Sequence, residues 1–152
     1  MPPRAARIVL RTVGVAIVAC ACLGLLYNGA SLFAAASGGL DKVTFPEPVP
    51  YLYEAFYTLS ALCVASYIAL LISGVQFIRL SFSLWWLLPA ALVIEGGLYF
   101  LTGRLWLHPE YGMSIAAATG IAEGGLVIIF FTFLPLWAPI LVLVAWHSLR
   151  RS

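Results

Sequence analysis

The sequence predicts an all-α membrane protein, an antiparallel bundle of four transmembrane helices forming one integral membrane domain over residues 1–152. Hydrophobic residues make up 63% of the chain and charged residues only 9%, and the mean hydropathy is +1.04. Soluble domains hold roughly 45–50% apolar and about 25% charged residues, so this chain could not cover itself with polar surface in water. The lipid bilayer is therefore its first expected partner.

Four apolar runs define the spans. They cover residues 12–36, 51–78, 84–102 and, for the last, 113 or 126 to 146. About 20 residues, at ~1.5 Å rise each, cross a bilayer core. Residues 37–50, "SGGLDKVTFPEPVP", contain three prolines and two glycines and predict a loop. The tight connection at 80–83 makes the second and third spans neighbours, and Pro89 predicts a kink in the third.

The last apolar run, residues 113–146, is too long for one upright helix. Two interpretations fit it. A short outer helix over 113–123 could break at the glycine pair 124–125 and lead into a span over 126–146, which is slightly favoured. Alternatively, one long tilted helix could kink at its two prolines.

The distribution of Lys and Arg orients the bundle. With four spans, one side holds six arginines and the other only Lys42 and Arg104. The six are Arg4, Arg7, Arg11, Arg79, Arg150 and Arg151. Basic residues concentrate on the cytoplasmic side, so both termini are expected in the cytoplasm, with a bacterial inner membrane as the expected location. Trp85, Trp86 and Trp146 then lie at inner ends, as interfacial tryptophans do.

The first span carries two weak processing signals. Residues 17–20, "IVAC", resemble a lipoprotein cleavage box, and residues 34–36, "AAA", resemble a signal-peptidase site. The chain stays largely apolar after the first signal, and the apolar run before the second is longer than a usual signal core. An uncleaved first span is therefore expected.

Glu95 is the acid that the sequence places deepest. It lies 11 residues into the third span, near mid-membrane. An ionised carboxylate there costs ~2.5–3.5 kcal/mol on insertion scales, so such a residue faces the bundle interior, pairs, or stays protonated. Tyr99 follows one turn later on the same face. The motif "EGGL" recurs at Glu123, and its glycines would let helices approach closely.

Polar residues of the other spans could meet Glu95. Cys20, Gly24, Asn28 and Ser31 form a small, polar stripe that suits close packing of the first helix. We call the residues predicted to converge in the outer half of the bundle, with His108 at its mouth, the outer polar cluster. They are Asn28, Glu54, Glu95, Tyr99 and Glu123.

Three carboxylates could hold a proton, a metal ion or a cationic ligand. The chain has no Glu-x-x-His, H-x-x-x-H or C-x-x-C spacing, so neither a metal site nor a cofactor is predicted. The cysteines Cys20, Cys22 and Cys63 lie in apolar runs and are expected to act as small hydrophobic residues. No catalytic residue is assigned.

The expected function is that of a non-enzymatic membrane subunit or accessory protein, associated with copies of itself or with other membrane subunits. No basic run with interleaved aromatics is present, so nucleic acid is not expected as a partner. One alternative is a small proton-coupled transporter or a cation- or ligand-binding protein. In outline the chain resembles small multidrug exporters, although those place the acid in the first span and here it lies in the third. A second alternative is a lipid-modifying enzyme using Glu95 and Glu123.

Overall fold

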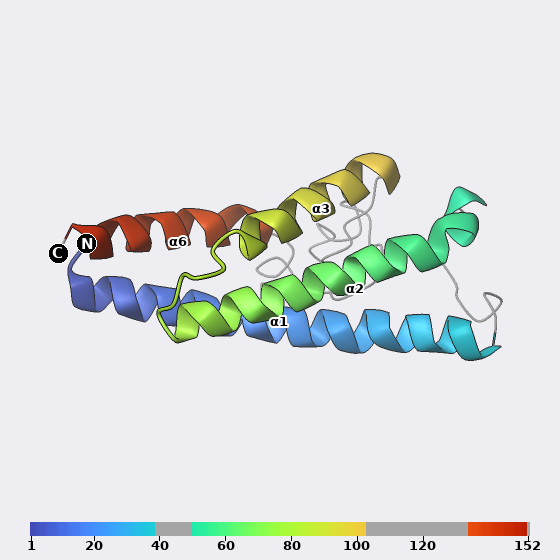
Figure 1. Ribbon diagram of the computed structural model, residues 1–152, viewed down its shortest axis with the longest axis horizontal. Helices are drawn as coiled ribbons and strands as arrows, with labels where there is room; N and C mark the ends of the chain where they lie inside the picture. Colours follow the sequence, from blue (N-terminus) through green and yellow to red (C-terminus); the bar gives the residue numbers. More distant parts are fainter. Residues whose placement is uncertain (39–49, 103–133, 152) are drawn as a thin grey trace, which may run out of the picture.

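The described part of the chain is helical throughout, apart from turns. The computed structural model describes residues 1–38, 50–102 and 134–151 (Figure 1). Its helices are α1 (Pro3–Gly38), α2 (Pro50–Ile78), α3 (Leu87–Thr102) and α6 (Leu134–Arg150). Side chains at 27, 31, 50–54, 95, 96, 99–102, 135 and 136 lie outside the described set. The predicted all-helical class is confirmed for these ranges.

Two helices are long and apolar enough to cross a membrane by length and composition, Pro3–Gly38 and Ala55–Ile78. The other two are shorter. The described parts of α3 and α6 are 16 and 17 residues long, about 24–26 Å at ~1.5 Å per residue, and both border the undescribed range 103–133. A membrane association therefore agrees with the structure, whereas four complete spans remain a prediction.

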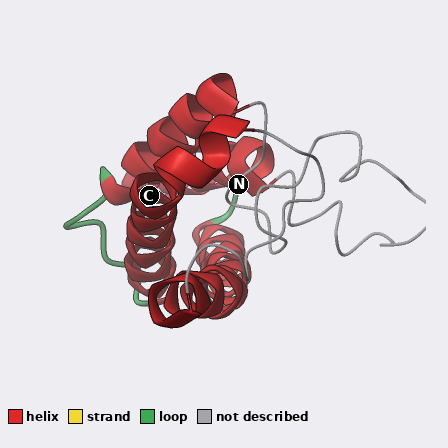
Figure 2. Cartoon of the chain, turned by 90° about the vertical axis from the view of Figure 1, so that its right-hand side faces the viewer, coloured by secondary structure: helices red, strands yellow, loops and turns green. Residues whose placement is uncertain are grey.

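Helices α1 and α2 pack side by side and antiparallel, and α6 and α3 follow one another along this pair (Figure 1). Helix α1 contacts α2 and α6, and α3 packs on α2 while touching α6 only slightly. The view turned by 90° shows the helices nearly end-on (Figure 2). Both termini lie at the same end, where the start of α1 meets the end of α6 (Figure 1). A chain that crosses a membrane an even number of times likewise has both termini on one side.

A shared apolar core joins all four helices. It includes Ile17 and Ala21 of α1, Leu70 of α2, Ala91 of α3 and Ala138 of α6, all of them buried. By contrast, Val15, Leu26, Phe33, Val93 and Leu143 are exposed on the outer surface. Apolar side chains on both the inside and the outside are what a lipid-facing bundle requires.

Glycines bring α1 and α2 into direct backbone contact. A Cβ atom built on Gly14 would lie 2.7 Å from the carbonyl oxygen of Gly74, and one built on Gly74 would lie 2.8 Å from that of Gly14. Real Cβ atoms do not approach backbone so closely, so both positions require glycine for this spacing. Small residues at the contact are typical of helix packing in membranes.

The third helix starts later than predicted. Residues 79–86 form turns, and α3 begins at Leu87 rather than at 84. Leu80 adopts φ 55°, and the Leu84 amide donates to Gln76 Oε1 at 3.2 Å. The Phe82 ring packs against Phe77 at 5.9 Å and Trp146 at 3.6 Å between centroids. These tertiary contacts keep residues 79–86 out of the helix and leave them as the connection between α2 and α3.

The predicted kink at Pro89 was therefore wrong. With α3 beginning at Leu87, Pro89 falls in the first helical turn, where backbone amides have no intrahelical acceptor. Its missing N–H leaves no helical bond broken, and the neighbouring Ala90 amide donates to the Trp86 carbonyl at 2.9 Å. Proline here starts the helix.

The last helix covers Leu134–Arg150 and continues past the predicted end at 146. Pro139 lies within this helix. Of the two interpretations of residues 113–146, the break at the glycine pair 124–125 falls outside the described residues, so the choice between it and one long helix stays open.

Candidate functional site

Asn28 is the member of the outer polar cluster whose side chain the structure describes. It lies in α1 and is fully buried, at 0% exposure. Its Nδ2 donates to the Gly24 carbonyl, one turn earlier, at 2.8 Å. Its Oδ1 is also buried and has no hydrogen-bond partner in the described part of the chain. Asn28 Nδ2 thus donates a hydrogen bond within α1, whereas the acceptor Oδ1 requires a donor from another residue.

The predicted stripe on α1 is buried as expected. Cys20 is buried at 1% exposure, and Gly24 packs directly beneath the Tyr67 ring of α2, which a Cβ at position 24 would overlap. Tyr67 is itself fully buried. The stripe therefore makes a close helix contact at Gly24, and Asn28 lies one turn beyond that contact. The side chain of Ser31, the last member, lies outside the described set.

Helix α3 carries two further candidates. Glu95 and Tyr99 are on the described backbone of α3, while their side chains fall outside the described set. Among the described side chains of this helix, Leu88, Ala91 and Leu98 are buried. Position 95 follows Ala91 by four residues and precedes Leu98 by three, so it belongs to the same helical stripe. Position 93, on the opposite side, is 74% exposed.

The remaining candidates cannot be placed with respect to Asn28. Glu54 is on the first turns of α2, with its side chain outside the described set. Glu123 and His108 fall in residues 103–133, which lie beyond the described ranges. Convergence of the five residues of the outer polar cluster therefore stays a prediction.

The described residues hold no group of three or more His, Cys, Asp or Glu side chains that could bind a metal ion. The three cysteines form no disulfide in the structure, with Cys20 and Cys63 buried in the core and Cys22 exposed. The burial of Cys20 and Cys63 agrees with their predicted role as small hydrophobic residues, whereas Cys22 lies on the outer surface of α1.

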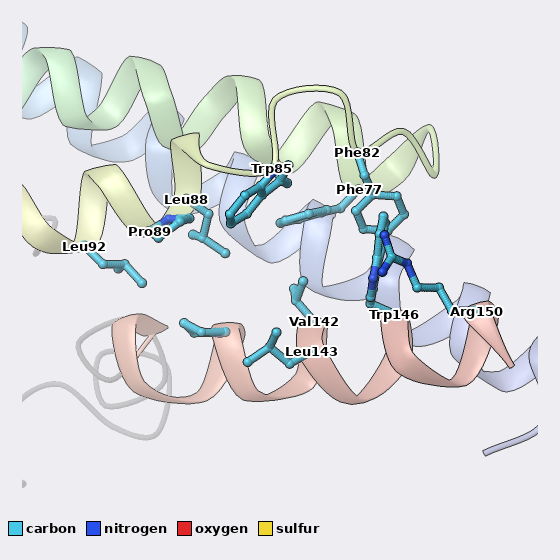
Figure 3. A pocket seen from close by; sticks show the side chains of 11 residues that line it. Phe77, Phe82, Trp85, Leu88, Pro89, Leu92, Val142, Leu143, Trp146 and Arg150 are labelled. Atoms are coloured by element: carbon cyan, nitrogen blue, oxygen red, sulfur yellow. The ribbon is translucent and has the colours of Figure 1, made fainter.

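A second feature was missed by the sequence analysis. A cavity of about 530 Å³ lies between α3, α6 and the 79–86 connection (Figure 3). Its walls are aromatic and aliphatic, and Arg150 is the one charged residue among the described residues that line it. The sequence offered a signal, because Trp85 and Trp146 were recognised as aromatic residues at the same end of the bundle. Their convergence on one cavity depends on the path of the connection.

Arg150 is held at this cavity by an aromatic ring. Its guanidinium carbon lies 4.8 Å from the centroid of the Trp146 ring, within the range of a cation–π contact. Trp146 stands one helical turn before Arg150 on α6, so the contact is local to the helix. Such a contact orients the guanidinium while leaving its N–H groups available to other acceptors.

Comparisons with protein-family models, with curated proteins and with solved structures found no match for this chain.

Proposed function

We propose that this chain is a non-enzymatic four-span membrane protein, a subunit or accessory protein, in which the outer polar cluster ties the helices together. The observation that carries the proposal is the buried Asn28, whose Oδ1 lacks a partner among the described residues. A buried acceptor without a donor lowers the stability of the fold by about 1–3 kcal/mol, and buried polar atoms are nearly always hydrogen-bonded. A donor is therefore expected from the undescribed side chains.

Helix α3, which shares the apolar core with α1, is the proposed source of that donor. Glu95 belongs to the stripe that includes Ala91 and Leu98, and both of these belong to the same core cluster as Cys20 and Tyr67. A protonated Glu95 carboxyl would donate one O–H to Asn28 Oδ1, and the Tyr99 hydroxyl is a second donor one turn away. In this arrangement the Glu95 carboxyl stays protonated and hydrogen-bonded, and it stabilises the contact between helices. Because the carboxyl carries no charge, the free-energy cost of placing a charge in the membrane does not arise.

Infrared difference spectroscopy in lipid nanodiscs tests the proposal. We expect a protonated-carboxyl band that is absent from Glu95→Gln and does not titrate between about pH 5 and 9, although a free Glu ionises near 4.3. The band should move to higher frequency in Asn28→Leu, because the acceptor is lost. Cys22→Ala, an exposed change on the same helix, serves as the control that leaves the band in place.

A titrating band would favour the other functional class. If the Glu95 band disappears with an apparent midpoint near neutrality, and if added organic cations shift that midpoint, the outer polar cluster is a proton- or cation-binding site of a carrier. The buried Asn28 Oδ1 also suits this alternative, since amide oxygens are ligands for hard cations. The proposal of a locked structural acid would then be withdrawn.

The proposed topology makes a separate prediction. The six arginines are all exposed where described, and both termini lie at one end of the structure. Reporter fusions at residue 1 and residue 152 should both show cytoplasmic location, and a fusion inserted between Gly38 and Pro50 should show the opposite side. Termini on opposite sides would contradict the four-span arrangement.

A further inference from the structure

We propose that the cavity between α3 and α6 binds one anionic phospholipid, with its phosphate at Arg150 and one acyl chain along the apolar walls. This inference rests on the proposed membrane location. It goes beyond the proposed function because it assigns a lipid site at the arginine-rich end, away from the outer polar cluster.

The shape and lining of the cavity suit an acyl chain. Its volume of about 530 Å³ falls within the roughly 300–1,000 Å³ of small-ligand pockets. Figure 3 shows Leu92 and Pro89 at one end and Trp146 and Arg150 at the other. The cavity thus runs from a charged end near the chain termini to a purely apolar end nearer the middle of the bundle. A phospholipid in a bilayer has the same polarity along its length.

The cavity is open towards the surroundings of the bundle. Leu143 is 67% exposed and Trp85 is 65% exposed, and both line the cavity. Helices α3 and α6 touch only slightly, so within the described ranges no close helix contact shuts the space between them. A lipid could therefore enter sideways from the bilayer, with no need for the bundle to open.

The charge around Arg150 selects an anionic headgroup. A small buried cluster of Ala6, Leu10 and Ala145 joins the start of α1 to the end of α6, with Leu80 and Leu149 packed against it. The chain neighbours of these residues include the exposed residues Arg7, Arg11, Arg79 and Arg150, and the exposed Arg151 follows Arg150. Basic clusters at membrane interfaces attract anionic lipids.

Arg150 has the geometry to bind a phosphate. The Trp146 ring fixes one face of its guanidinium, and a planar guanidinium can donate two parallel hydrogen bonds to phosphate oxygens. Arg151, the next residue, is exposed and does not line the cavity. Arg151 has the same charge as Arg150 but does not line the cavity, so a substitution of Arg151 is a matched control.

Native mass spectrometry of the full chain, released from detergent micelles, tests this site. The probes are phosphatidylglycerol, phosphatidylcholine and glycerol 3-phosphate at equal concentration. We expect one retained phosphatidylglycerol per chain, about fivefold more than phosphatidylcholine, which is the factor contributed by one basic side chain at an anionic surface. Arg150→Gln should abolish this preference, whereas Arg151→Gln should retain it. Glycerol 3-phosphate should not be retained, because it lacks the acyl chain.

A second variant tests the volume of the cavity independently of the charge of Arg150. Leu143→Trp adds volume at an exposed lining position and should reduce retention of both phospholipids by several-fold without changing the fold measured by circular dichroism. Equal retention of the two phospholipids by the unmodified chain, or an unchanged preference in Arg150→Gln, would overturn the proposal. A chain that does not partition into membranes would instead overturn the proposed function, so the two failures are distinguishable.

Discussion

Tyr67→Ala is expected to lower the free energy of unfolding by about 3–5 kcal/mol, the range found when large aromatic side chains are truncated in protein cores. Tyr67 is fully buried and is among the largest side chains in the interior. Its ring fills the space that Gly24 leaves on α1, one turn before Asn28. The measurement is reversible unfolding in mixed micelles, followed by circular dichroism. Tyr57, in the same helix but 46% exposed, is the matched control, and Tyr57→Ala should cost about 1 kcal/mol, chiefly the hydrogen bond to the Ala35 carbonyl.

An exchange of volume across the contact tests the mechanism itself. Gly24→Leu alone should be as damaging as Tyr67→Ala, because the new side chain would overlap the Tyr67 ring. In the double variant Gly24→Leu/Tyr67→Ala, the leucine occupies the vacated space, so the double variant should be more stable than either single one. If the two losses simply add, the two residues do not share one packing contact.

The part of the site carried by α1 could be predicted because it depends on a single helical period. Cys20, Gly24 and Asn28 recur every four residues, so they share one face of any helix that contains them. An apolar helix can bury a stripe of small residues against a neighbour, and α2 covers this one. The length and apolar character of the second run likewise predicted the end of α2 at Ile78, whereas α1 starts at Pro3, well before the predicted start at residue 12.

The cavity could not be predicted, because its walls come from segments that no local pattern brings together. The Phe82 ring must leave the path of a helix to contact Phe77 and Trp146, and only tertiary packing decides that it does. The same contacts delay the start of α3, which is why the effect of Pro89 was misjudged. In an apolar run, proline indicates a kink or a helix start, and the choice depends on where the preceding turn ends.

Gly14→Leu is expected to lower the free energy of unfolding by at least ~2 kcal/mol, because the added side chain would force α1 and α2 apart. A Cβ at Gly14 would meet the Gly74 carbonyl oxygen at 2.7 Å and a side-chain carbon of Ile78 at 2.9 Å, and the backbone oxygen cannot move away without shifting α2. Gly74→Leu should act in the same way. Because the two glycines form one contact, the double variant should lose less than the sum of the single losses.

Gly29→Leu provides the control with the opposite expected sign. Gly29 lies in the same helix, and a Cβ there would meet nothing within 4 Å. Since leucine favours a helix over glycine by roughly 0.5–1 kcal/mol, this substitution should be neutral or slightly stabilising. Unfolding of Gly14→Leu, Gly74→Leu and Gly29→Leu in mixed micelles shows whether the loss of stability comes from the α1–α2 contact or from any large side chain added to α1. Equal losses at Gly14 and Gly29 would mean that the direct approach of α1 to α2 is not what these glycines provide. The packing that buries Asn28 would then need another cause.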